Sequence, residues 1–227
     1  MEPVSDAELR LSRLESGPIP EERFDEVIAH LRDSFFADEP LNRSVSLCAR
    51  GQPHRELEEH ARATLRDGLS EMVLDAATDR VVGVALNGVL LPDDLSASQA
   101  KLAEMDDAKF RRIFGLLYSV NRRLDLFTKY GVDRIFECRI LSVDNRYRGR
   151  GLARQLLERS IETARAAGFQ LVKEDATGLF SQRAAESMGF QTVCELPYEE
   201  YTDEAGRVVF PIEAPHKSLK IMVKELR

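Results

Sequence analysis

The chain has 227 residues, of which 43% are hydrophobic and 31% charged, and its formal net charge is −7. This length suits one large globular domain, to which we assign residues 1–227. Its apolar runs fall far short of the roughly 20 residues that a membrane-spanning helix needs, which excludes an integral membrane protein. The acidic balance also argues against a nucleic-acid partner, because phosphates and an acidic surface repel each other.

The cysteines and the N-terminus indicate a reducing compartment. Cys48, Cys138 and Cys194 are odd in number and far apart, which gives neither a disulfide framework nor the spacing of a zinc site. We interpret each as a small buried thiol, and we expect no bound metal. Residues 1–10 are acidic and lack the apolar segment of a secretory signal. We therefore expect a cytoplasmic protein with no membrane partner.

The first half of the chain contains two predicted helices and a hairpin. Apolar residues at helical spacing predict a helix over 21–35 and a weaker one over 54–66. Residues 72–75 and 81–87 are rich in β-formers and are separated by a polar turn, which predicts a β-hairpin. We expect the polar segment 92–105 to be a surface excursion.

The second half alternates helices with strands. The apolar spacing predicts a helix over 107–129 that Gly131 ends, a strand over 134–143, a helix over 152–167, a strand over 169–174, a short helix over 178–188 and two late strands over 191–195 and 218–224. Such mixing predicts a single α/β domain, whose mixed central sheet is flanked by helices on both faces.

A strand, a loop with two glycines and a helix follow one another over residues 140–153. Glycine lets the backbone turn tightly and brings its N–H groups close to a ligand. The N-terminus of the helix adds unsatisfied N–H groups and a partial positive charge, so the segment fits a pyrophosphate. Six arginines between Asp144 and Arg165 suit a small anionic ligand better than a long polyanion. The spacing differs from both the dinucleotide fingerprint and the P-loop.

The pattern Arg146-x-x-Gly149-x-Gly151-Leu152-Ala153 resembles the acetyl-CoA pyrophosphate motif of the GNAT superfamily of N-acetyltransferases. The order of elements along nearly the whole chain is also similar to that superfamily. The resemblance implies acetyl-CoA as co-substrate without a metal, and a GNAT-like fold in which a splayed strand pair holds it. It assigns acetyl-CoA binding to Leu141, Ser142 and Val143 of the strand, and to Arg148, Gly149, Arg150, Gly151, Leu152 and Ala153. The strand residues would make main-chain contacts, which is compatible with an ordinary place in the sheet core.

Two further segments resemble the insect arylalkylamine (dopamine-type) N-acetyltransferases. One is Phe35-Phe-Ala-Asp-Glu-Pro-Leu41, and the other is the ending Ala214–Lys224. This resemblance implies that a small-molecule amine such as dopamine, tyramine, octopamine or serotonin accepts the acetyl group by direct transfer in a ternary complex. We expect a monomer.

Acetyl transfer to an alkylamine faces an electrostatic problem. Such amines have pKa values near that of lysine, about 10.4, and are protonated at neutral pH. A base must accept the proton, directly or through a water, before the nitrogen attacks the thioester. The resemblance assigns this role to Glu39, and burial near the acyl group would raise its pKa toward the working range. Without the resemblance, Glu39 would be one of 39 acidic residues, placed in a solvated loop.

Departure of CoA calls for a proton donor or a hydrogen bond at its sulfur. The resembling family uses hydroxyl residues at the start of the penultimate helix for substrate and proton handling, and Thr177 and Ser181 occupy those positions. Thr177 also has the sequence context of a helix N-cap, an alternative that stays open here. The neighbouring Phe180 cannot donate a proton.

Other histidines and aromatic residues have simpler interpretations. His30, His54 and His60 have no evident partner, and we expect them on the surface. His216 lies in the family-like ending and could line the amine pocket. At helical spacing, Phe110, Phe114 and Tyr118 are more typical of core than of an aromatic cage around a substrate.

Four alternatives remain at this level. The same fold could acetylate agmatine or another polyamine, or a peptide, which would need an open groove. The protein could also bind CoA in a regulatory role without catalysis, and an assay of turnover would identify this case. A nucleotide-binding protein could use the glycine loop, although no Lys-Ser/Thr pair follows the glycines.

Overall fold

The computed structural model describes residues 13–226, and a seven-stranded mixed sheet forms its centre. All neighbouring strands are antiparallel except β4 and β5, which run parallel. In spatial order the strands are β1 (Leu14–Pro18), β2 (Glu71–Asp75), β3 (Arg80–Leu90), β4 (Ile135–Val143), β5 (Leu171–Ala176), β7 (Ser218–Glu225) and β6 (Gln191–Pro197).

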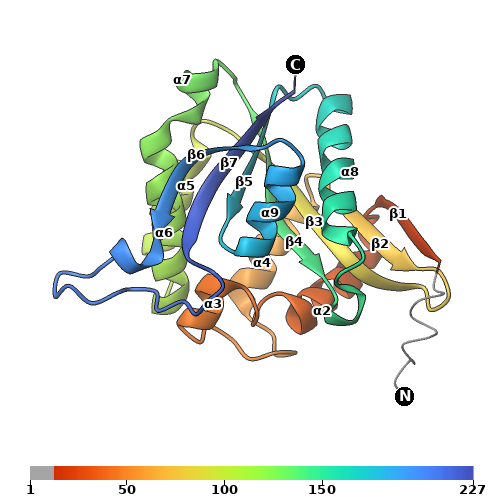
Figure 1. Cartoon of the computed structure of the whole chain (residues 1–227), viewed down its shortest axis with the longest axis horizontal. Coiled ribbons are helices and arrows are strands. Elements are labelled where there is room, and N and C mark those ends of the chain that lie inside the picture. Colours follow the sequence, from red (N-terminus) through yellow and green to blue (C-terminus); the bar gives the residue numbers. More distant parts are fainter. Residues whose placement is uncertain (1–12, 227) are drawn as a thin grey trace.

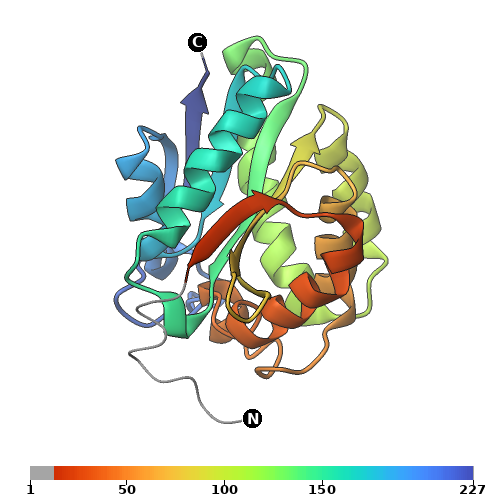
Figure 2. The ribbon, with the colours of Figure 1, turned by 90° about the vertical axis from the view of Figure 1, so that its right-hand side faces the viewer.

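Helices cover both faces of the sheet, as predicted. Figure 1 shows α8 (Leu152–Ala166) and α9 (Leu179–Ser187) in front of it, over a core that contains Phe136 and Leu157. Figure 2 shows α2 (Phe24–Ser34), α4 (Arg55–Leu65) and α6 (Ala108–Leu124) on the opposite side, over a larger core around Leu31 and Leu116. The shorter elements are α3 (Pro40–Ser44), α5 (Asp94–Ala103), α7 (Leu126–Tyr130) and the 3-10 turns η1 (Glu21–Arg23), η2 (Asn145–Tyr147) and η3 (Tyr198–Glu200). None of these described helices is long and apolar enough to cross a membrane.

Most predicted elements have the predicted type and similar bounds. The hairpin over 72–75 and 81–87 is formed by β2 and β3, with a one-residue irregularity after Val73. Residues 1–10, whose composition argues against a secretory signal, lie outside the described residues. Among the cysteines, Cys138 is buried as expected, whereas Cys48 and Cys194 are half-buried.

Some predictions need correction. The segment 92–105 contains helix α5, because its Leu95 and Leu102 are seven residues apart, share one helix face and pack against α6. The helix predicted over 107–129 breaks at Asp125, whose φ of 40° is left-handed and whose carboxylate accepts the N–H of Thr128, capping α7. Strand β1 and helix α3 were not predicted.

Strands β4 and β5 separate soon after they meet. Only Phe136, Glu137 and Cys138 pair with β5, opposite Val172 to Glu174, although β4 continues to Val143. Strand β3 pairs with β4 as far as Val143, the last residue of β4. Within the described chain, the far half of β4 therefore has a strand neighbour on one side only, and the predicted splayed strand pair is confirmed.

An ion network lies where the two strands separate. The Lys173 ammonium, whose side chain is fully buried, pairs with Glu137 on β4 and with Asp175 on β5, the latter at 2.8 Å. Arg139 Nε donates to Glu137 at 2.9 Å, and Asn121 Nδ2 donates to Asp175 at 2.7 Å. Burial favours the neutral form of Glu137, but the two cations hold its pKa well below the usual range. The network thus joins β4, β5 and α6.

We expect Lys173→Met to lower the free energy of unfolding by about 3–5 kcal/mol, because removal of one partner leaves buried charge uncompensated. The control is Lys220→Met, which removes a half-exposed pair with Glu186. Such surface pairs contribute about 0–1 kcal/mol. Urea unfolding followed by circular dichroism measures both, and equal losses would contradict the assigned importance of the network.

Candidate active site

A cavity of about 1210 Å³ connects the glycine loop before α8, the gap between β4 and β5, and helices α4, α5 and α6. The predicted catalytic residues Glu39, Thr177 and Ser181 all line it. So do most predicted cofactor-binding residues, namely Leu141, Ser142, Val143, Arg148, Gly149, Gly151, Leu152 and Ala153. Arg150 is not in this lining, and its guanidinium lies 5.1 Å from the centre of the Tyr147 ring.

The glycine loop presents free backbone donors to the cavity. Gly149 and Gly151 have φ values of 77° and 78°, a left-handed conformation that favours glycine. Gly151 is the N-cap of α8 and supplies no side-chain acceptor. The N–H groups of the first turn of α8 are therefore available to an anion, as the sequence predicted.

A buried hydrogen bond anchors this loop to the sheet. The Tyr147 hydroxyl donates to Asp75 Oδ2 of β2 at 2.5 Å. Burial and the Asp75 carboxylate raise the pKa of Tyr147 to about 12. The phenol thus stays protonated and holds the loop in place.

Several arginines of the predicted basic region are already paired. Arg146 makes an ion pair with Asp144 at 2.7 Å, and Arg159 one with Glu71 at 2.9 Å. Arg148 Nε donates to the Val143 carbonyl, while its Nη2 lies 3.7 Å from Asp38. The half-exposed Arg148 therefore stands at the junction of the loop with the segment that carries Glu39 and is placed to contact a phosphate.

Glu39 brings a carboxylate with a buried oxygen into the site. It is the N-cap of α3, and its Oε2 accepts the N–H of Asn42 at 2.7 Å. Its Oε1 is buried, and no described residue makes a hydrogen bond with it. Burial raises the pKa of Glu39, while the N–H of Asn42 and the Thr177 hydroxyl act in the opposite direction. Such a carboxylate is a stronger base than an exposed one.

The two hydroxyl residues have different surroundings. Gly178, not Thr177, is the N-cap of α9, so the alternative that Thr177 is a cap is wrong. The His216 ring supplies the missing acceptor, because its Nδ1 accepts the N–H of Leu179 at 3.0 Å. This ring also lines the cavity. Ser181 Oγ donates to the Gly178 carbonyl at 3.0 Å.

The other three histidines are not on the surface, which corrects the prediction. His30 is buried with Nε2 3.0 Å from Ser142 Oγ, and burial lowers its pKa to about 4. His54 is buried and caps α4. His60 lines the cavity with its ring 5.1 Å from that of Phe114, and burial lowers its pKa to about 4. All three were misassigned because their burial depends on distant elements.

The α6 aromatics form an apolar wall of the cavity. Phe110 and Phe114 stack at 4.1 Å, and Tyr118 lies 5.8 Å from Phe114. Phe110 and Phe114 belong to the core, as predicted, and all three also line the cavity. Sequence reasoning missed the polar lining that Glu137, Arg139, Glu174 and Asp175 add. The signal was charged residues inside predicted strands, namely Glu137 and Arg139 within 134–143 and Lys173 and Glu174 at the end of 169–174.

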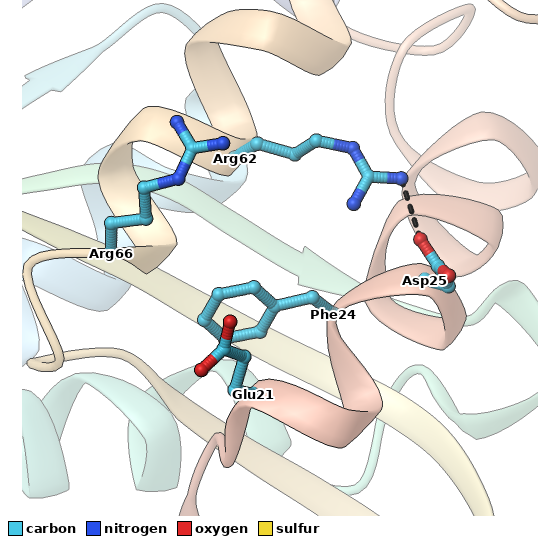
Figure 3. Close-up of a pocket in the computed structure, with 5 residues that line it drawn as sticks. All are labelled: Glu21, Phe24, Asp25, Arg62 and Arg66. Atoms are coloured by element: carbon cyan, nitrogen blue, oxygen red, sulfur yellow. Dashed lines mark hydrogen bonds and ion pairs between the residues drawn. The ribbon is translucent and has the colours of Figure 1, made fainter.

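Two other places bring charged side chains close together. His54, Glu56 and Asp107 bring potential metal-ligating atoms within 4.8 Å of one another. However, His54 and Asp107 act as helix caps there, and nothing else points to an ion. Figure 3 shows a separate pocket of about 200 Å³, between Glu21, Phe24 and Asp25 on one side and Arg62 and Arg66 on the other. An ion pair of 2.7 Å between Arg62 and Asp25 spans it, and it contains none of the predicted site residues.

Comparison with known proteins agrees with this geometry. The model of the acetyltransferase (GNAT) family matches residues 48–190. The structure of arylalkylamine N-acetyltransferase 2 from Aedes aegypti is 48% identical, with a TM-score of 0.92, over 95% of this chain and all of that chain. Putative arylalkylamine N-acetyltransferase 7 from the same mosquito is 30% identical, with a TM-score of 0.77, over 93% of this chain and 87% of that chain. Polyamine N-acetyltransferase of Drosophila melanogaster shares the fold, with 22% identity and a TM-score of 0.83 over 94% of this chain and 100% of that chain.

We expect Gly151→Ala to weaken CoA binding by about 5- to 30-fold, because left-handed strain of about 1–2 kcal/mol displaces the donors of the α8 N-terminus. Gly131→Ala is a matched control, since Gly131 also has a left-handed φ, of 64°, and both positions have open space for a methyl group. Gly131 does not line the cavity. Titration calorimetry with CoA measures both. Equal weakening in the two variants would contradict a phosphate site at Gly151.

Proposed function

The chain belongs to the GNAT acetyltransferase family and is an acyltransferase, and from that premise we propose that it transfers the acetyl group of acetyl-CoA to the primary amine of an arylalkylamine. One observation carries the proposal: a single cavity joins the glycine loop, the unpaired side of β4 and the carboxylate of Glu39. The loop would hold the pyrophosphate, β4 would hold the pantetheine arm, and Glu39 would receive the amine.

Glu39 is the proposed general base. In its charged form it attracts the cationic amine and accepts a proton, after which the neutral nitrogen attacks the thioester carbonyl. The raised pKa of Glu39 makes it a stronger base than an exposed carboxylate. Thr177 acts on Glu39 and favours the charged form, so we assign it a role in proton handling at this carboxylate.

The proposed transfer is direct, in a ternary complex. The cavity contains one cysteine that could form an acyl-enzyme, Cys138, but burial raises its pKa well above the usual value, so it remains a weakly nucleophilic thiol. Ser181 lies on the α9 side of the same cavity, and we assign its hydroxyl a hydrogen bond to the departing sulfur.

The aromatic wall that α6 forms in the cavity supports an arylalkylamine as the acceptor. Phe110, Phe114 and Tyr118 offer aromatic surface to a ring. The carboxylates of Glu137 and Asp175 are paired with Lys173 and are therefore poor partners for the second cation of a polyamine. The 48% identity to an arylalkylamine N-acetyltransferase points the same way. We propose a small-molecule partner only, a monomer, and action in the cytoplasm.

A panel of amines tests the acceptor class. Thiol release from acetyl-CoA is measured with dopamine, tyramine, octopamine, serotonin, agmatine, spermidine and a lysine peptide, and we expect the highest kcat/KM for the arylalkylamines. Turnover of agmatine or spermidine alone would replace the proposal with a polyamine acetyltransferase. Binding of CoA without turnover of any amine would indicate a catalytically silent protein.

We expect Glu39→Gln to lower kcat/KM by about 10²–10⁴ at neutral pH, since general-base catalysis contributes that much. The wild-type activity should fall as pH drops through the raised pKa of Glu39, where the base becomes protonated. The defect of the variant should shrink as pH rises toward 10, because more of the amine arrives already neutral.

The matched control for that variant is Glu59→Gln, which removes an exposed carboxylate from the same cavity lining. It should keep the wild-type pH profile. Calorimetry with CoA checks that Glu39→Gln still binds the co-substrate, because Glu39 also caps α3. A Glu39→Gln enzyme with an unchanged pH profile would remove Glu39 from the role of base.

A further inference from the structure

A carboxyl group outside the proposed mechanism lies where β4 and β5 separate. Glu174 pairs with Cys138 in the last pair that joins the two strands. It lines the cavity, yet only 3% of its surface is exposed. Its buried Oε2 has no hydrogen-bond partner among the described residues. Buried polar atoms are rarely left without a partner, and this one belongs to a residue that lines the cavity.

Glu174 is a neutral acid at neutral pH. Burial raises its pKa to about 8, and the nearby charge of Asp175 adds to the rise. In this state the carboxyl group carries a proton that it can donate.

Among the described residues, burial and the charge of Asp175 act on the Glu174 carboxyl group, and both favour its neutral form. The side chains that share its face of the sheet are neutral: Cys138 on β4, Met222 on β7, Leu157 on α8 and Ala185 on α9. The charged side chains nearby are Glu137, Lys173 and Asp175, which point to the opposite face because side chains alternate along a strand. Lys173 is already engaged there by both carboxylates.

The direction of β4 brings Glu174 toward the reactive end of acetyl-CoA. The phosphate loop follows Val143, whereas Cys138 lies five residues earlier, roughly 17 Å back along the strand at about 3.3 Å per residue. An arm that begins at the loop and follows β4 into the gap therefore ends near Cys138 and Glu174. That end carries the thioester.

Ser181 alone is a poor source of the proton that the sulfur needs. Its hydroxyl donates to the Gly178 carbonyl, so it can donate a hydrogen bond to the sulfur only after it leaves that acceptor. Phe180, its neighbour in α9, has no proton to give. Glu174 lines the same cavity and holds an unengaged carboxyl oxygen.

We propose that Glu174 is the general acid of the reaction and donates its proton to the sulfur of the departing CoA. The inference rests on the proposed acetyl transfer and assigns a further catalytic residue to it. The amine nitrogen forms a bond to the carbonyl carbon, the carbon–sulfur bond breaks with its electron pair on sulfur, and that sulfur takes the Glu174 proton. Glu39 takes the first proton of the cationic amine and passes it to solvent before the attack, and after the attack it takes the second proton that the nitrogen loses as it becomes an amide. Release of that proton to solvent and uptake of one by Glu174 restore the starting state.

Kinetics of Glu174→Gln test the role. The change replaces a neutral acid by a neutral amide of the same size, which can donate a hydrogen bond but cannot transfer a proton. We expect kcat to fall about 100-fold, the usual contribution of general acid catalysis, with little change in the KM of acetyl-CoA. In the wild type, kcat should fall above about pH 8 as Glu174 loses its proton. The variant should lack that limb, and Glu174→Asp should retain it.

Proton uptake gives a readout without turnover. Binding of CoA covers Glu174 further and favours its neutral form, so calorimetry at pH 8 in buffers of different ionisation enthalpy should detect net proton uptake by the wild type. Glu174→Gln should lack this uptake. Cys138→Ala is the control: it changes packing in the same strand pair, leaves the carboxyl group, and should keep both the uptake and the basic limb of kcat.

The outcomes separate the two proposals. If the wild-type enzyme acetylates amines and Glu174→Gln has the same kcat, the proposed role of Glu174 is wrong. A lower kcat with the basic limb still present would also contradict that role, because it indicates a packing effect. Wild-type protein that acetylates no amine overturns the proposed function. If a thermal melt shows that Glu174→Gln is not folded, the test relies on the basic limb of Glu174→Asp and on proton uptake by the wild type.

Discussion

The active-site region depends on one parallel strand pair in an otherwise antiparallel sheet. Parallel strands end at the same edge, so the elements that follow β4 and β5 begin side by side. Helix α8 follows β4 and α9 follows β5, which aims two helix N-termini at the same gap. One N-terminus is left open by Gly151, and the other is occupied by the His216 ring. The fold thus places one open helix N-terminus and one that is capped by a side chain at the same gap.

The early separation of these strands leaves backbone groups of β4 without a strand partner, which is unfavourable in a buried sheet unless a ligand pairs with them. An extended molecule with amide groups can pair with such an edge as a further strand would. The ion network of Lys173, Glu137 and Asp175 lies at the start of the separation and ties both strands to α6. The network therefore fixes the positions of β4, β5 and α6 relative to one another at the point where the gap begins.

Local sequence patterns predicted the strands and helices that build this arrangement, and a short motif predicted the phosphate loop, because both depend on residues close together in the chain. The errors concern properties set by distant residues. Helix α5 has too few apolar residues to be recognised alone, and its Leu102 is explained only by α6. Thr177 has the sequence context of an N-cap, but the hydrogen bond that caps α9 comes from His216, which is far along the chain. The Lys173 network requires the register of β4 against β5, which no local pattern contains.

Two glutamates of the cavity, Glu39 and Glu174, illustrate how one fold separates acid from base. Glu39 sits at a helix N-terminus, where the N–H of Asn42 and the Thr177 hydroxyl oppose the effect of burial and favour the charged form. Glu174 sits in a strand interior among neutral side chains, where burial and the charge of Asp175 both favour the neutral form. Different environments for two like groups are the usual means by which a site assigns one to accept a proton and the other to donate it. The difference here arises from secondary structure, because a helix terminus offers free N–H donors and a strand in mid-sheet has already used its own.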